Sequence, residues 1–200
     1  MELSPRTIRE QVTNQIRNDL VSGRFEAGTM LREAELVNRF GVSRGPVRDA
    51  FIQLSHEGFL AYYPNRGVMV RQPPNPDDRP FIMSLRVQIE THAIERGCET
   101  VSDAGLQKVE AALAELKTAC ESQSAPAIAL HDVEFHESIV IACGCEDLVP
   151  AWRQLCSRML MAYSRLNNYD EAYSEHVEIF ECLRSRNTKA TIKAVKSNII

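Results

Sequence analysis

Several features that would place a chain in a common class are missing from these 200 residues. No apolar run approaches the ~20 residues that a membrane-spanning helix requires. The first residues, Met1 to Arg6, lack the apolar core of a signal peptide. A nucleophile motif and a glycine-rich phosphate loop are missing as well. We therefore expect a cytoplasmic protein with no membrane partner, and the missing motifs argue against an enzyme.

Paired cysteine motifs are also lacking, although the chain has six cysteines. The chain is neither small nor secretory in appearance, which disfavours disulfides. Cys143 and Cys145 have no second thiol pair near them, which disfavours a cysteine zinc site. All six lie among apolar residues of helical pattern, where cysteine behaves as a small hydrophobe. We predict buried free thiols.

A strong positive charge, typical of many nucleic-acid binders, is missing too. The net charge is −4, but residues 1–71 carry a net charge of +2 and residues 72–200 a net charge of −6. The asymmetry favours a nucleic-acid partner for the first part only weakly. Any DNA contact there must come from a few placed arginines rather than from a general positive field.

The most informative segment that is present reads GVSRGPVRD and joins two short amphipathic stretches. Gly41 allows the first helix to end in a left-handed conformation, and Ser43 is a good N-cap for the second. Pro46 falls in the first turn, where its missing N–H costs no helical hydrogen bond. Arg44 and Arg48 then lie on the first turns of the second helix, within reach of guanine edges or phosphates. This layout predicts a DNA-binding helix-turn-helix.

The surrounding residues complete a winged helix. Ser4 and Pro5 are typical of a helix start, and the helix of residues 43–56 has an apolar stripe that predicts its buried face. Residues 59–63 and 68–70 are two β-prone runs around a Pro-Asn-Arg-Gly turn, which indicates a hairpin. Arg66 at the tip of this wing could enter the minor groove.

The proline-rich segment 73–80 predicts a stiff linker between two domains. The first, residues 1–72, is the winged helix-turn-helix. The second, residues 81–200, has no strand pattern and reads as an all-α helical bundle. The chain is therefore expected to be mostly α. The predicted helical stretches are 80–99, 103–120, 125–142, 146–168, 171–185 and 188–199.

The first domain resembles the GntR family of bacterial transcription regulators. The resemblance is carried by Gly23, Gly28, Leu31, Glu33, Leu36, Gly41 to Arg44, Pro46 to Arg48, Ala50, Leu54, Glu57-Gly58, Arg66-Gly67 and Val70. Ala34 stands where some relatives have a DNA-contacting arginine, and Gly45 replaces a common threonine. The DNA-binding residues implied by the resemblance are Ser43, Arg44, Gly45, Arg48, Arg66 and Gly67.

The second domain resembles the FCD effector domain of the FadR-like branch, in its shorter, VanR-like version. The matching motifs begin at Leu85-Arg86, at His131-Asp132 and at Glu175-His176. Together the two resemblances span nearly the whole chain.

A metal site is the next implication of the resemblance. Asp132 and His136 lie four residues apart, so they share one helix face, although such pairs are common without a metal. Many FCD domains place one carboxylate and three histidines around a divalent metal, and His176 matches while Asn198 replaces the last histidine. The expected site holds Zn²⁺, Ni²⁺, Mn²⁺ or Fe²⁺ on Asp132, His136 and His176, with Asn198 as a weaker ligand or a partner of a bound water.

Arg86 is the candidate effector residue. An arginine on the first helix of a closed bundle needs a partner. Glu90, four residues on, is one possibility. In the family the matching arginine binds a carboxylate ligand bidentately, which implies a small organic acid as effector.

Three functions remain open from the sequence. The leading one is a transcription regulator, acting as a homodimer on a pseudo-palindromic operator and responding to a small carboxylate. The alternative is a metal-dependent hydrolase or oxygenase that uses the Asp/His/His set, but its candidate base, Glu134, points away from the metal face. A structural DNA-binding protein without an effector leaves Arg86 and the Asp/His set without a purpose.

Overall fold

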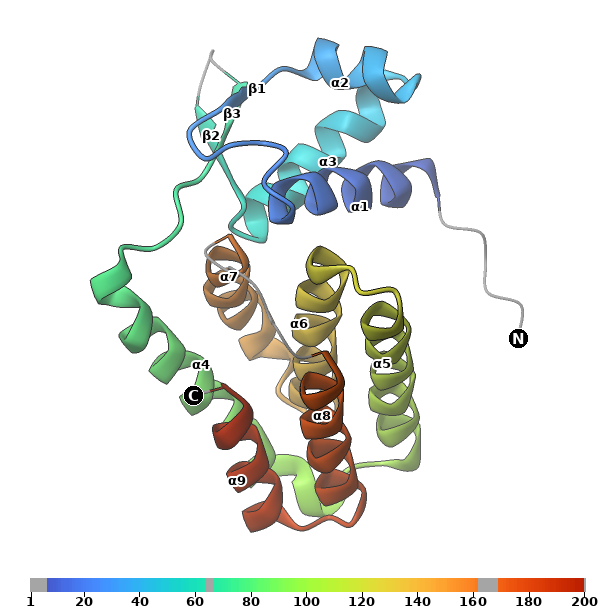
Figure 1. The fold of residues 1–200 in the computed structure, drawn as a ribbon, viewed down its shortest axis with the longest axis vertical. Helices are drawn as coiled ribbons and strands as arrows, with labels where there is room; N and C mark the ends of the chain where they lie inside the picture. The colour runs from blue at the N-terminus through green and yellow to red at the C-terminus, as the bar shows by residue number, and fades with distance from the viewer. Residues whose placement is uncertain (1–6, 64–66, 162–168, 200) are drawn as a thin grey trace. The chain divides into compact units, whose positions relative to one another are not determined.

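The computed structural model describes residues 7–63, 67–161 and 169–199. The chain forms two compact units that divide between Pro74 and Asn75. Figure 1 shows helices in both units and strands only in the first. Within the described ranges, no helix has the length and apolar character needed to cross a membrane.

The first unit is a winged helix. Its helices are α1 (Ile8–Val21), α2 (Glu33–Phe40) and α3 (Arg44–His56), and its strands are β1 (Met30–Leu31), β2 (Leu60–Tyr63) and β3 (Gly67–Val70). The three strands form one antiparallel sheet in the order β1-β3-β2. The predicted hairpin is β2–β3, whereas β1 was not predicted, because two residues are too few to show an alternating pattern.

The start of α1 differs from the sequence prediction. The helix begins at Ile8, and Thr7 is its N-cap in an extended conformation. The Glu10 backbone N–H donates to Thr7 Oγ1 at 3.3 Å, and the Thr7 N–H donates to Glu10 Oε2 at 2.8 Å. This reciprocal capping box satisfies two free backbone donors. The cap predicted at Ser4 is therefore wrong for this helix, and Ser4 itself lies outside the described residues.

The core of the first unit lies where α1 packs against α3 (Figure 1). The predicted apolar stripe of α3 is buried. Burying such side chains contributes about 1.5–3 kcal/mol each relative to leaving them exposed. This packing fixes the faces of α3, so that its arginines remain on the surface. The buried apolar residues of the two helices are Val12, Ile16, Leu20, Val47, Ala50, Phe51 and Leu54.

The described part of the second unit contains only helical elements. Its α-helices are α4 (Arg79–Gly97), α5 (Asp103–Glu121), α6 (Ala125–Ala142), α7 (Val149–Leu160), α8 (Tyr169–Arg184) and α9 (Thr188–Ile199). Most bounds agree with the predicted stretches within two residues. The stretch predicted at 146–168 instead begins with the 3-10 turn Glu146–Leu148, and its last residues lie outside the described ranges.

A close helix approach shapes this bundle. At Gly97, the last residue of α4, an added Cβ would lie 2.2 Å from the backbone oxygen of Cys143, which follows α6. Only glycine allows the two backbones to come this near. α4 also packs on α9, and α8 packs on both α5 and α9. Helices far apart in sequence are thereby held around one apolar core that includes Ala93, Phe135, Ile139, Ile179 and Val195.

Candidate DNA interface and metal centre

The turn between α2 and α3 has the predicted backbone and the predicted N-cap residue, but that residue makes no capping hydrogen bond. Gly41 ends α2 in the left-handed region with φ of 64°. Ser43 is the N-cap of α3 and is extended, yet its side chain makes no capping hydrogen bond. An N-cap side chain accepts from the second or third helical N–H, and the third residue here is Pro46, which has none. The exposed Ser43 hydroxyl is therefore not used as a cap.

The arginines of α3 point away from its buried stripe. Arg44 and Arg48 are both exposed, as is Gly45 between them. Arg48 is paired, which sequence reasoning missed. Its Nε donates to Glu33 Oε1 at 3.2 Å, and its Nη2 donates to Glu33 Oε2 at 3.3 Å. These hydrogen bonds, with the carboxylate charge, raise the pKa of the Arg48 guanidinium.

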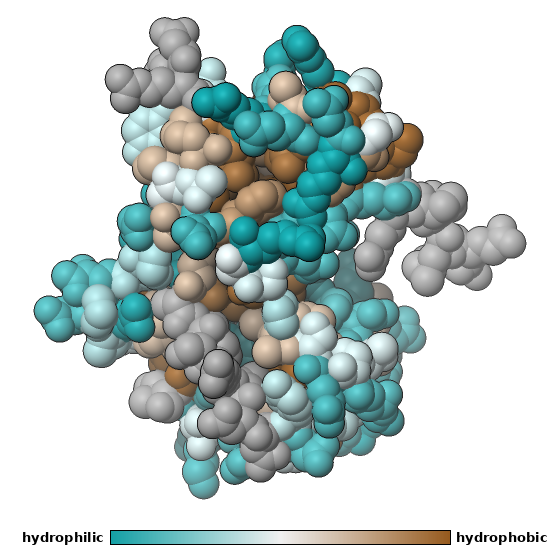
Figure 2. All heavy atoms as spheres, turned by 45° about the horizontal axis from the view of Figure 1, so that its top comes forward, coloured by the Kyte–Doolittle hydropathy of each residue, from teal (hydrophilic) through white to brown (hydrophobic). Residues whose placement is uncertain are grey.

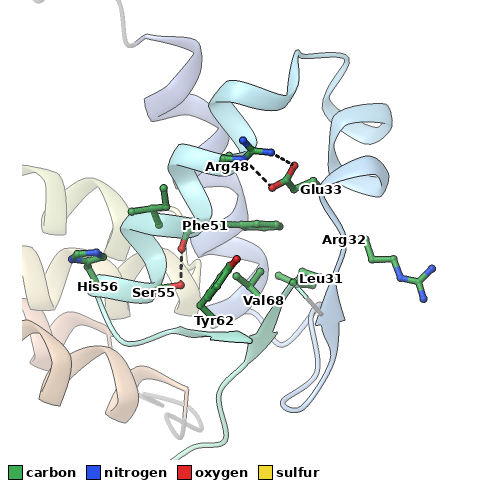
Figure 3. Close-up of a pocket in the computed structure, with 11 residues that line it drawn as sticks. Leu31, Arg32, Glu33, Arg48, Phe51, Ser55, His56, Tyr62 and Val68 are labelled. Atoms are coloured by element: carbon green, nitrogen blue, oxygen red, sulfur yellow. Dashed lines mark hydrogen bonds and ion pairs between the residues drawn. The ribbon is translucent and has the colours of Figure 1, made fainter. Parts of the chain in front are cut away.

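The Arg48–Glu33 pair lies at one end of a groove between α3 and the sheet (Figure 3). The groove has a volume of about 740 Å³. Gly67, predicted to contact DNA, is among its lining residues, whereas Arg66 lies outside the described residues. Figure 2 shows hydrophobic surface among hydrophilic side chains on the face it displays. The exposed large hydrophobic residues of the first unit are Ile8, Ile52, Tyr62 and Tyr63.

The four predicted metal-site residues are brought together in the second unit. Asp132 and His136 come from α6, His176 from α8 and Asn198 from α9. One ligand atom from each of Asp132, His136 and His176 lies within 4.8 Å of the others. Asn198 Oδ1 lies 3.0 Å from His136 Nε2, and both histidines are buried. The i,i+4 pair on α6 thus has partners from two other helices.

Every ring nitrogen of the two histidines faces an oxygen. A neutral imidazole has one N–H donor and one acceptor nitrogen, so two neutral rings can donate to only two of the four. The remaining nitrogens need a cation, whether a proton or a metal, between them and the oxygen. The four oxygens are Glu90 Oε2 at 2.7 Å and Asn198 Oδ1 at 3.0 Å for His136, and the Ala172 carbonyl at 2.7 Å and Asp132 Oδ1 at 3.0 Å for His176.

Arg86 has the internal partner that the sequence offered. Its Nε donates to Glu90 Oε1 at 2.7 Å. Its Nη2 lies 3.7 Å from Asp132 Oδ2, and this buried nitrogen has no hydrogen-bond partner among the residues that the structure describes. Burial alone would lower the pKa of Arg86, but Glu90 and the other nearby anionic groups outweigh it and raise that pKa. One donor of the guanidinium is therefore unused beside the metal-site carboxylate.

Sequence reasoning missed the central role of Glu90. Besides Arg86 and His136, Trp152 contacts this carboxylate, because its Nε1 donates to Glu90 Oε1 at 2.9 Å. Burial would raise the pKa of Glu90, but His136 and Arg86 lower it to about 2. Only the position of Glu90 in the Leu-Arg-x-x-Ile-Glu motif could have signalled this role. The carboxylate holds the Nδ1 side of His136 and leaves Nε2 toward the site, as partners of metal-bound histidines commonly do.

Comparison with known families agrees with this architecture. The family model of the FCD domain matches residues 82–199, and that of the bacterial regulatory proteins of the gntR family matches residues 8–70. The chain belongs to the GntR family. As in its FadR-like branch, an N-terminal helix-turn-helix precedes a C-terminal FCD domain. The resemblance to this family predicted from the sequence is confirmed.

GntR relatives are similar over nearly the full chain. The HTH-type transcriptional repressor RspR of Escherichia coli (strain K12) is 25% identical over 203 residues, which cover 99% of this chain and 89% of the relative. The gluconate operon transcriptional repressor of Bacillus licheniformis is 27% identical over 187 residues, 94% of this chain and 75% of the relative. The solved structure of E. coli McbR/YncC is similar with a TM-score of 0.74 and 20% sequence identity. The match covers 98% of this chain and 94% of the McbR/YncC chain.

These findings decide between the function classes left open by the sequence. The chain is a GntR transcription regulator with an FCD domain, and its relatives are regulators rather than enzymes. The metal-dependent hydrolase or oxygenase is therefore set aside. DNA binding follows from the GntR helix-turn-helix.

Proposed function

We propose that this GntR regulator is a repressor whose helical unit binds a divalent metal and a small organic acid. The observation that carries the proposal is the set of four oxygens facing the ring nitrogens of His136 and His176. The arrangement favours positive charge between these groups. The names of two relatives, both repressors, support the direction of regulation.

The donor set fits a first-row divalent metal. Two imidazole nitrogens and a carboxylate oxygen suit Zn²⁺, Ni²⁺, Mn²⁺ or Fe²⁺. Metal–nitrogen and metal–oxygen bonds of about 2.0–2.2 Å place ligand atoms of one ion about 3–4 Å apart. The mutual distances of at most 4.8 Å among Asp132, His136 and His176 are close to that spacing. Asn198 Oδ1 would add a weaker oxygen ligand or hold a bound water. A bound metal would supply open positions for an anionic ligand.

Arg86 would hold the effector carboxylate. Its Nε donates to Glu90, which fixes the guanidinium, while its buried Nη2 has no hydrogen-bond partner within the described ranges. A carboxylate that accepts from Nη2 would satisfy this donor, and charge-assisted hydrogen bonds of this kind are strong. The same carboxylate could reach the metal, because Asp132, a proposed ligand, lies 3.7 Å from Nη2.

We assign the DNA contacts to the first two turns of α3 and to the wing. We infer that Arg44 and Arg48 read bases or phosphates, with Ser43 and Gly45 at the helix start beside them. Arg66 and Gly67 would contact DNA from the hairpin. One winged helix covers only a half-site, so a homodimer joined mainly through the helical units would bind a pseudo-palindromic operator.

Metal binding is tested with protein purified without a chelator or a metal-affinity tag. Elemental analysis and titration with Zn²⁺, Ni²⁺ and Mn²⁺ should give one metal per chain. His136→Ala should abolish uptake, because it removes a ligand. His131→Ala is the matched control on the same helix, since His131 pairs with Glu134 instead, and it should bind like the wild type. Absence of metal in the wild type both before and after titration contradicts the metal proposal.

The effector is tested by fluorescence anisotropy of operator DNA with a panel of small carboxylates, gluconate included. At least one should weaken DNA binding by the wild type. Arg86→Lys keeps a positive charge beside Glu90 but loses the planar fork, so it should retain metal and lose this response. A full response in Arg86→Lys would show that Arg86 does not hold the ligand.

A further inference from the structure

The ion pair between Glu33 and Arg48 joins the first residue of α2 to the recognition helix. It is bidentate, with both carboxylate oxygens engaged. Arg48 nonetheless keeps 64% of its side chain exposed, while Glu33 keeps 33%. Figure 3 shows the two side chains pointing toward each other across the end of the groove. The guanidinium is thus fixed on one edge and accessible on the other.

The Arg48 nitrogens that bind Glu33 determine which N–H donors of the guanidinium remain available to DNA. A guanidinium has five N–H donors in a rigid fork. Glu33 takes one donor from Nε and one from Nη2, which lie along one side of the group. Both donors of Nη1 and the second donor of Nη2 remain, and one donor from each of these two nitrogens forms the terminal fork. Guanine offers two acceptors, O6 and N7, in the major groove, and a bidentate arginine matches them.

The Glu33–Arg48 ion pair is expected to add little to the stability of the fold. Exposed ion pairs contribute little to folding. A carboxylate at a DNA-facing surface also repels phosphates, so it lowers general affinity. Helix α2 gains from negative charge in its first turn, but Glu35, in the same turn, can serve that purpose. What Glu33 alone provides is a fixed orientation for Arg48.

We propose that Glu33 is a positioning residue for operator reading, which holds Arg48 by its Nε edge and presents the terminal fork to one guanine in each half-site. The inference rests on the proposed DNA contact of α3. It adds a residue that never touches a base yet determines which base is preferred. Glu33 lowers the affinity for DNA of any sequence and raises the preference for guanine at that one position.

The test uses the full chain and a DNA duplex selected by the wild-type protein from a random-sequence pool. Each base pair of a half-site is then changed in turn, and affinity is measured by anisotropy. Glu33→Ala should reduce the preference for guanine at one position by about five- to tenfold, within the range of a bidentate arginine–base contact. Affinity for random DNA should stay the same or rise.

Glu35→Ala is the matched control. It removes the same charge from the same turn of α2, but Glu35 pairs with exposed Arg32 and not with Arg48. It should change affinity for all sequences alike and leave the guanine preference intact. Glu33→Gln, which keeps the side-chain size, should behave like Glu33→Ala, because an amide cannot accept with both terminal atoms.

A double variant shows whether Glu33 acts through Arg48. In an Arg48→Ala background, Glu33→Ala should have no further effect on base preference. The proposal is overturned if Glu33→Ala and Glu33→Gln both keep the guanine preference, or if they weaken all duplexes equally. It is also overturned if the effect persists without Arg48. Failure of the wild type to select any DNA, or full binding by Arg48→Ala, contradicts the DNA contact itself.

Discussion

Replacing Glu90 with glutamine tests the centre of the helical unit. The substitution keeps the size of the side chain and removes its charge. Glu90 is 2% exposed and accepts from three buried side chains, Arg86, His136 and Trp152. The packing around it therefore stays filled, and any loss of stability comes from the polar contacts.

The size of the stability loss depends on Arg86, whose buried charge loses its main partner. Removing one member of a buried ion pair costs about 3–5 kcal/mol, because the other charge is left uncompensated. Asp132 lies 3.7 Å from Arg86 Nη2 and keeps part of the compensation. We therefore expect a loss near the lower end, about 3 kcal/mol. The new amide can still accept from Arg86 and Trp152, but it turns an N–H₂ group toward His136.

The assay is urea unfolding in the presence of a chelator, so that bound metal does not contribute. Glu121→Gln is the control, because Glu121 is an exposed residue whose ion pair with Lys117 is long, at 3.9 Å. It should change the free energy of unfolding by less than about 0.5 kcal/mol. A loss of less than about 1 kcal/mol in Glu90→Gln would refute the reasoning, because that is the scale of an ordinary hydrogen bond.

The remaining predictions concern packing, thiols and the metal set. Gly97→Ala should lower the free energy of unfolding by about 1–3 kcal/mol, because the added methyl group would meet the Cys143 backbone. Gly45→Ala is the control: a Cβ there meets no atom within 4 Å, so stability should not fall. Thermal melts compare the two variants. Burial raises the pKa of Cys143 to about 12 and also raises that of Cys182, but Cys182 is half-buried whereas the other five cysteines are buried. Maleimide should therefore label Cys182 first, and mass spectrometry of native Cys182→Ser should show no fast-labelled site. Asn198→His should tighten metal binding in a competition titration by replacing an amide oxygen with an imidazole nitrogen; unchanged affinity would place Asn198 outside the metal's coordination shell.

Local signals predicted most of the fold. The apolar stripe of α3 and the break at Gly41 depend on neighbours within one or two helical turns, and the structure agrees with both. The two-residue strand β1 was missed because its only pairing is with β3, almost forty positions away in the chain. Nothing within Met30–Leu31 itself distinguishes a strand from a loop. The start of α1 was misplaced because Ser4-Pro5 and Thr7 are both acceptable starts, and the capping box with Glu10 decides between them.

In the candidate site, too, contacts within one helix could be predicted from the sequence, whereas contacts between helices could not. The spacing of Asp132 and His136 could be seen on one helix, and the resemblance supplied His176, Asn198 and Arg86. Apart from Glu90, four residues after Arg86 on the same helix, their partners could not be predicted, because those contacts are made across helices. Arg48 meets Glu33 from another helix, and Trp152 reaches Glu90 from 62 residues away. A sequence shows which side chains need partners, whereas the packing of helices selects them.

The wide spacing of the polar contacts in the helical unit also bears on folding kinetics. The contacts that meet at the two histidines join residues 44, 46 and 62 positions apart. Closing such long loops costs entropy, so we expect these contacts to form after the folding transition state. Interactions absent from the transition state act mainly on the unfolding rate. A ligand that bridges these helices should therefore lengthen the lifetime of the folded regulator while leaving the speed of its folding nearly unchanged.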